Sequence, residues 1–196
     1  MKLSSVVRKF AKTSISGWDG VKWVANVGKV DFLASSRFVS SHEFDTKVQY
    51  VLVPLDDLSL DNYAVVRVDS TQQIWLVGMQ TQDVSGNPYS KFYALRRAES
   101  IGELYSFSKT LAVSGTAKSV TRELVGTYFC SVEHVTATPS KVFKTHKFTD
   151  CLLTMPRNCP LDNSHEVKIG NTFYEVNDAF DNTGFKMCRA IGKRSV

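Results

Sequence analysis

The sequence predicts a mainly β protein built from two tandem small β-barrel or sandwich modules, each opened by a short N-terminal helix. Short runs of β-branched and aromatic residues, bounded by Gly, Asn and Asp, recur along the chain and are typical of strands and turns. The second half also repeats parts of the first. The chain has 196 residues, of which 43% are apolar, which is enough to form two small hydrophobic cores. We expect residues 1–105 to form the first module and residues 106–196 the second.

The strongest part of the repeat joins two segments without a gap. Leu60-Asp61-Asn62 returns as Leu161-Asp162-Asn163, and Val66-Arg67-Val68 returns as Val167-Lys168-Ile169. The offset between the copies is 162 − 61 = 101 residues. Self-similarity at a fixed spacing is the signature of repeated structural units. The two halves are therefore predicted to share one fold and one strand order.

Two weaker matches keep the same order along the chain. The segment from Phe10 to Gly17 resembles the segment from Phe107 to Gly115, with one extra residue in the second copy. His42-Glu43-Phe44-Asp45 also resembles the segment from His146 to Asp150. Four matches in one order are hard to obtain by coincidence, which favours a duplication.

Each copy then continues into a strand, a turn and an apolar-aromatic strand. Gly170 suits a tight turn that needs a positive φ. A second turn and a last strand follow, so each module is predicted to end as a three-stranded meander. Earlier strands near residues 46–54 and 125–135 would close a small barrel or sandwich. Trp75 and Tyr174 are expected on comparable strands, and the residues expected to help fill the cores are Leu76, Val77 and Val176.

Helix signals are few. Leu3, Val6, Val7 and Phe10 are spaced i, i+3, i+4 and i+7, which predicts an amphipathic helix over residues 2–12 with an apolar face for assembly contacts. Residues 100–103 have the spacing of a capping box, which predicts a short helix opening the second module. One more helical turn is expected within residues 117–124.

The charge distribution leaves two interpretations open. The formal net charge is +5 and the pI is about 9.0. Some basic residues are candidates for contact with DNA or with an acidic partner, although an ordinary solvated face would look the same. These candidates are Arg96, Arg97, Lys141, Lys144 and Lys147.

No catalytic, metal-binding or cofactor-binding residues are predicted, and no cofactor is expected. The four cysteines form no CxxC pair and have no zinc-ligand spacing, so we expect reduced, mostly buried thiols, with a disulfide as the alternative. Asp178 and Asp181 lack the spacing of a calcium loop and are assigned to a hairpin turn. Asp56, Asp57 and Asp61 are assigned to a solvated loop. No long apolar run or signal-peptide region predicts a membrane association.

The terminal meander resembles a known family. Its second copy reads Val167-Lys168-Ile169-Gly170-Asn171-Thr172-Phe173-Tyr174-Glu175-Val176, and its first carries Val66-Arg67-Val68-Asp69 and Trp75-Leu76-Val77, with Arg96-Arg97 at its end. This pattern resembles the small β-barrel proteins of tailed-phage necks, which are the head–tail connector, stopper and tail-completion families. The tandem arrangement departs from their usual single barrel.

The resemblance implies a non-enzymatic structural protein of a tailed-phage virion, made in the bacterial cytoplasm. Such a protein would form a homo-oligomeric ring, contact portal or tail proteins and lie near packaged double-stranded DNA, without a membrane. The alternative is a nucleic-acid-binding protein with two small β-barrels, and the third hypothesis is an enzyme with an unrecognised site. Acidic residues interspersed among the basic ones favour the structural protein over the nucleic-acid-binding one.

Overall fold

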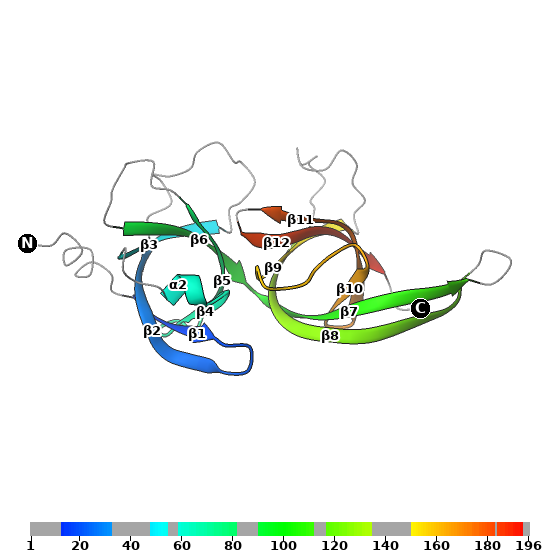
Figure 1. Cartoon of the computed structure of the whole chain (residues 1–196), viewed down its shortest axis with the longest axis horizontal. Helices are drawn as coiled ribbons and strands as arrows, with labels where there is room; N and C mark the ends of the chain where they lie inside the picture. Colours follow the sequence, from blue (N-terminus) through cyan, green and yellow to red (C-terminus); the bar gives the residue numbers. More distant parts are fainter. Residues whose placement is uncertain are drawn as a thin grey trace, which may run out of the picture. The chain divides into compact units, whose positions relative to one another are not determined.

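A computed structural model of the chain contains two six-stranded sheets, each closed into a barrel (Figure 1). It describes residues 13–32, 48–54, 59–81, 90–111, 117–134, 150–182 and 184–193. The prediction of a mainly β protein with two β-rich modules is confirmed. Within these ranges, no helix is long and apolar enough to cross a membrane.

The division between the two compact units falls between Ala98 and Glu99. Two short stretches of the second half, Pro156–Asn158 and Thr183–Phe185, group with the first unit. The predicted boundary after residue 105 is displaced, because residue 105 lies inside a long strand of the second barrel.

The first barrel has strands in the closed order β1-β2-β3-β6-β5-β4, and all its pairings are antiparallel. A short helix, α2 (Ser59–Asn62), precedes β4. The strands are β1 (Thr13–Trp18), β2 (Trp23–Phe32), β3 (Val48–Pro54), β4 (Val65–Val68), β5 (Ile74–Thr81) and β6 (Ser90–Ala98).

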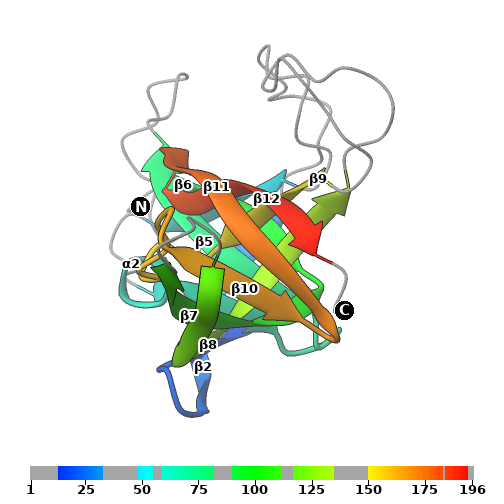
Figure 2. The same ribbon diagram turned by 90° about the vertical axis from the view of Figure 1, so that its right-hand side faces the viewer.

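The second barrel has the closed order β10-β11-β12-β9-β8-β7. Figure 2 shows β10, β11 and β12 running around its wall. The strands are β7 (Ser100–Leu111), β8 (Ala117–His134), β9 (Asp150–Met155), β10 (His165–Ile169), β11 (Thr172–Asn182) and β12 (Phe185–Lys193).

The two barrels have the same strand order. If β1 to β6 are matched in turn with β7 to β12, every pair of neighbouring strands in the first barrel has an equivalent pair in the second. Each barrel also ends in the predicted meander, β4-β5-β6 in one and β10-β11-β12 in the other. The prediction of a shared strand order is therefore confirmed.

Two of the predicted helices are wrong. Residues 100–103 begin strand β7, and residues 117–124 lie in strand β8. Strands β7 and β8 pair from Ser100↔Cys130 to Leu111↔Ala117 with two register shifts, and this long ladder outweighs the local helix signals. The predicted helix over residues 2–12 lies outside the described residues.

Each barrel is filled by its own apolar cluster. The first cluster includes Trp75, which is 5% exposed and packs its ring 5.5 Å from that of Phe32. Trp75 pairs with Val66, and Tyr174 pairs with Val167, so the two aromatic residues occupy the same register position in their barrels. Tyr174 is half-buried against the second cluster, so the predicted equivalence of these two residues is confirmed.

The other predicted core residues are also buried. Val77 belongs to the first cluster and Val176 to the second. Leu76 is fully buried but lies outside the first cluster, because successive side chains of a strand point to opposite faces.

The structure supports one part of the repeat and corrects another. Leu60 and Leu161 both enter a core, as do Val66 and Val167, which agrees with the offset of 101. Gly17, however, pairs with Val66, whereas Leu104 pairs with Val167. Gly17 therefore corresponds to Leu104, and its match with Gly115 is wrong.

The reason for a glycine at position 17 is local packing. A Cβ atom on Gly17 would lie 2.4 Å from the ring of Tyr63. At Gly170 the predicted positive φ is confirmed, at 58°, in the turn between β10 and β11.

Candidate functional site

The predicted basic residues are only partly accessible to a partner. Arg97 is exposed, whereas Arg96 is 1% exposed, so little of the Arg96 side chain is accessible to DNA or to a partner protein. Arg96 lies in the middle of the first barrel's wall, between Val48 of β3 and the fully buried Leu76 of β5. The remaining candidates lie outside the described residues, and they are Lys141, Lys144 and Lys147, together with the apolar Leu3, Val6, Val7 and Phe10.

Two cations on the outer face of the second barrel are neutralised by carboxylates. Nε of Arg122 donates to Oε2 of Glu166 at 2.6 Å, and Nζ of Lys168 donates to Oε2 of Glu103 at 3.2 Å. Both cations also lie over the ring of Phe173, at 4.6 Å and 6.0 Å from its centre. Cations paired in this way contribute little to attracting phosphates, so this face is a poor candidate for a DNA contact.

A two-stranded ribbon extends beyond the second barrel (Figure 1). Strand β7 pairs with β10 only up to Ser106, and from Phe107 to Leu111 it pairs only with β8 among the described strands. We call Phe107–Leu111 and Ala117–Arg122 the β7–β8 arm. Five further residues of β7 and six of β8 add roughly 15–20 Å of strand.

Along most of its length, the outer edge of β8 has no pairing partner among the described strands. Strand β8 pairs with β9 only from Ser131 to His134. No other described strand pairs with its outer edge from Ala117 to Tyr128. Near the base of the β7–β8 arm, Leu124 is 53% exposed and Val125 is 42% exposed. An open edge beside exposed apolar side chains is a surface that another strand can cover.

In the first barrel, a polar cluster surrounds the carboxylate of Asp61. Its Oδ1 accepts a hydrogen bond from the hydroxyl of Tyr93 at 2.5 Å, and its Oδ2 accepts one from Nζ of Lys91 at 2.9 Å. Burial by itself raises the pKa of Asp61, but these hydrogen bonds and the charge of Lys91 together lower it. The assignment of Asp61 to a simple solvated loop is therefore wrong. Asp61 lies in helix α2, and two residues of strand β6 bind its carboxylate.

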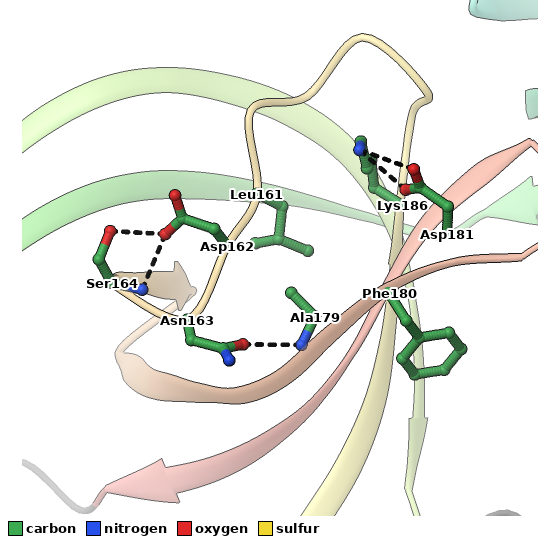
Figure 3. Close-up of a pocket in the computed structure, with 8 residues that line it drawn as sticks. All are labelled: Leu161, Asp162, Asn163, Ser164, Ala179, Phe180, Asp181 and Lys186. Atoms are coloured by element: carbon green, nitrogen blue, oxygen red, sulfur yellow. Dashed lines mark hydrogen bonds and ion pairs between the residues drawn. The ribbon is translucent and has the colours of Figure 1, made fainter.

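The matching segment of the second barrel lines an open pocket of about 440 Å³ (Figure 3). We call it the Asp162 pocket. Its lining residues are Leu161, Asp162, Asn163, Ser164, Ala179, Phe180, Asp181 and Lys186. All of them belong to the second unit.

All the donors to Asp162 gather on one of its two oxygens. The amide and hydroxyl of Ser164 donate to Oδ1 at 2.8 and 2.5 Å, and Nδ1 of His165 lies 2.6 Å from the same oxygen. These hydrogen bonds, those of Ser164 foremost, lower the pKa of Asp162 and keep the carboxylate charged at neutral pH. Figure 3 shows the other oxygen directed away from Ser164.

The opposite side of the Asp162 pocket contains an internal ion pair. Nζ of Lys186 lies 2.8 Å from Oδ1 of Asp181. Oδ1 of Asn163 accepts a hydrogen bond from the amide of Ala179 at 2.8 Å, which ties the loop before β10 to strand β11. Two carboxylates and one ammonium leave a local charge of −2 + 1 = −1 in a chain whose total is +5.

The four cysteines lie in the core of the second barrel. All four are free thiols and at most 1% exposed, as expected for buried thiols, and they are Cys130, Cys151, Cys159 and Cys188. Burial raises the pKa of Cys130 and of Cys159 to about 12. Since the thiolate is the nucleophilic form, these thiols are poorly suited to covalent catalysis.

Among the residues that the structure describes, no group of three or more His, Cys, Asp or Glu side chains could hold a metal ion. Asp181 instead pairs with Lys186 beside the hairpin turn between β11 and β12. No family model and no curated protein sequence matches this chain.

Sequence reasoning missed the β7–β8 arm and the Asp162 pocket. A continuous run of strand-forming residues on both sides of residues 112–116 was a signal for the arm. The repeated Leu-Asp-Asn segment marked the pocket, although its chemistry depends on neighbours that are distant in sequence.

Proposed function

We propose that this chain is a non-enzymatic structural protein of a tailed-phage virion, which forms a ring as a head–tail connector, neck or tail-adaptor component. The sequence resemblance of the terminal meander to phage neck barrels motivates the particle and the location. The virion setting, the portal or tail partners and the proximity to packaged DNA all follow from that resemblance.

The observation that supports assembly is the open edge of β8. A two-stranded ribbon is only marginally stable alone in water, because it buries little apolar surface. The β7–β8 arm thus gains stability when another strand pairs with it or another surface covers it. Leu124 and Val125 add exposed apolar area at the arm's base.

The proposed occupant of this edge is a second copy of the same chain. A contact between the arm of one subunit and a different surface of the next is heterologous, and a closed series of such contacts gives a ring. The opposing nucleic-acid interpretation has less support, because Arg96 is buried and Arg122 and Lys168 are paired with carboxylates.

The test is the oligomeric state of Leu124→Lys, measured by light scattering after size-exclusion chromatography and by native mass spectrometry. We expect the wild-type chain to form a closed oligomer and Leu124→Lys to weaken it. Val21→Lys is the matched control, because Val21 is 85% exposed in the first barrel and far from the arm in sequence.

A second variant replaces residues 108–120 with a short glycine turn and removes most of the β7–β8 arm. We expect this variant to keep two folded barrels and to remain monomeric. A wild-type chain that stays monomeric at high concentration, or an oligomer that survives both changes, would contradict assembly through the arm.

A further inference from the structure

The Asp162 pocket and the Asp61 cluster occupy corresponding places in the two barrels. Asp61 and Asp162 stand in the repeated Leu-Asp-Asn segment, each after a leucine that enters its core. Lys91 and Lys186 also correspond, since each comes two residues before a core-facing residue, Tyr93 or Cys188, of the barrel's last strand.

In the first barrel, the cation beside the Asp61 carboxylate is the barrel's own Lys91. Nζ of Lys91 lies 2.9 Å from Oδ2 of Asp61, and the lysine side chain is only 10% exposed. The hydroxyl of Tyr93 takes the other oxygen. Both oxygens of Asp61 thus have a donor from within the barrel.

The second barrel differs at both positions. Cys188 replaces Tyr93, and its short side chain lies fully inside the core, so it offers no hydroxyl at the rim. Lys186 pairs with Asp181, while Asp162 takes its donors from the adjacent Ser164 and His165. Those donors all meet Oδ1, and the side chain of Asp162 is 63% exposed.

We propose that the Asp162 pocket binds a cationic nitrogen group, an ammonium or a guanidinium, on Oδ2 of Asp162. The group would stand where Lys91 stands in the first barrel. Leu161 lines the same pocket and can contact the ligand's alkyl part. The donor is a lysine or arginine side chain of a polypeptide or a free alkylamine, which share the same chemistry.

The test is a titration of the ¹⁵N-labelled full chain, followed by NMR in an amine-free phosphate buffer. The ligands are n-butylammonium, methylguanidinium and, as a neutral control, n-butanol. We expect saturable shifts of the Ser164 and Ala179 amides with the two cations but not with butanol. A single charge-assisted contact suggests a dissociation constant on the order of millimolar, which weakens as salt is added.

Variants identify the carboxylate. Asp162→Asn should weaken binding by about tenfold or more, a loss of one charge-assisted hydrogen bond. Asp61→Asn is the matched control in the first barrel and should leave the affinity unchanged. Lys186→Ala, which releases Asp181, should strengthen binding several-fold, and this expected gain cannot be produced by a loss of folding.

The source of the cation is resolved by two further ligands. A capped tripeptide with a central lysine or arginine that binds more tightly than butylammonium indicates a polypeptide donor, and tighter binding of spermidine indicates a free amine. Equal shifts in Asp162→Asn and the wild type, equal shifts with butanol, or no shifts at about 100 mM cation would overturn the proposal. None of these outcomes depends on whether the chain forms a ring.

Discussion

Arg122 and Glu166, 44 residues apart, form a 2.6 Å ion pair at the place where the β7–β8 arm leaves the second barrel. Glu166 is 1% exposed, whereas the arginine side chain is 36% exposed and stacks over Phe173. A buried carboxylate needs such a partner, because water cannot solvate its charge. This ion pair therefore fixes the base of the arm to the wall of the barrel.

The first prediction concerns that ion pair. Arg122→Ala should destabilise the second barrel by about 1–3 kcal/mol, because Glu166 loses a charged donor while it remains buried. The partial exposure of Arg122 keeps the loss below that of a fully buried pair. Urea unfolding followed by tryptophan fluorescence and circular dichroism measures the change.

Two controls make the result specific. Arg97→Ala removes an exposed arginine and should change stability by less than about 0.5 kcal/mol. The double variant Arg122→Ala/Glu166→Gln should recover part of the loss, since the buried carboxylate charge that Arg122 pairs with is then gone. A double variant that is less stable than Arg122→Ala would argue against this explanation.

The second prediction concerns the core of the first barrel. Trp75→Ala should cost about 3–5 kcal/mol, because the buried indole leaves a cavity against Phe32. Differential scanning calorimetry should show a lower melting temperature for the transition in which the first barrel unfolds. An unchanged melting temperature would mean that Trp75 is a surface contact residue and not part of the core.

The third prediction concerns thiol reactivity. Ellman's reagent should label the native chain very slowly and should count four thiols after denaturation without a reductant. Burial raises the pKa of Cys130 and of Cys159 from 9.0 to about 12, so little thiolate exists at neutral pH. A count of two thiols in the denatured chain would reveal a disulfide.

The same shifts give a pH dependence. A thiol whose pKa is raised on folding contributes stability that is complete below its unfolded pKa of 9.0 and is lost as the pH rises towards about 12. Stability of the reduced chain should therefore fall between pH 9 and pH 10.5 more steeply than that of Cys130→Ala/Cys159→Ala. Parallel curves for the two proteins would contradict the thiol contribution.

Sequence reasoning worked best where local pattern and tertiary contact agree. The Leu-Asp-Asn and Val-x-Val segments lie in register in both barrels because each sends the same residues into a core. Trp75 and Tyr174 could be matched for the same reason, since both stand opposite a core valine. Gly170 could be assigned from the φ angle that its turn requires.

The failures occur where long-range pairing overrides local signals. Residues 100–103 have a helical capping pattern, yet Gly102 lies so close to Val167 that an added Cβ would be 2.9 Å from its methyl group. Strand pairing with β8 and β10 decides that conformation. Arg96 was expected at the surface because an arginine is usually exposed, and its burial depends on tertiary contacts that the sequence alone does not reveal.

The shared ring order also creates a hazard during folding. Each barrel closes only when its third strand meets its sixth, so an unfinished barrel could capture the wrong last strand, as happens in repeat proteins. The side chains discourage this exchange: Val51 faces the large Tyr93, whereas the larger Leu153 faces the small Cys188. Swapping the last strands would place valine against cysteine, leaving a void, and leucine against tyrosine, producing a clash. The sequence divergence between the two copies thus favours pairing of each last strand with the third strand of its own barrel.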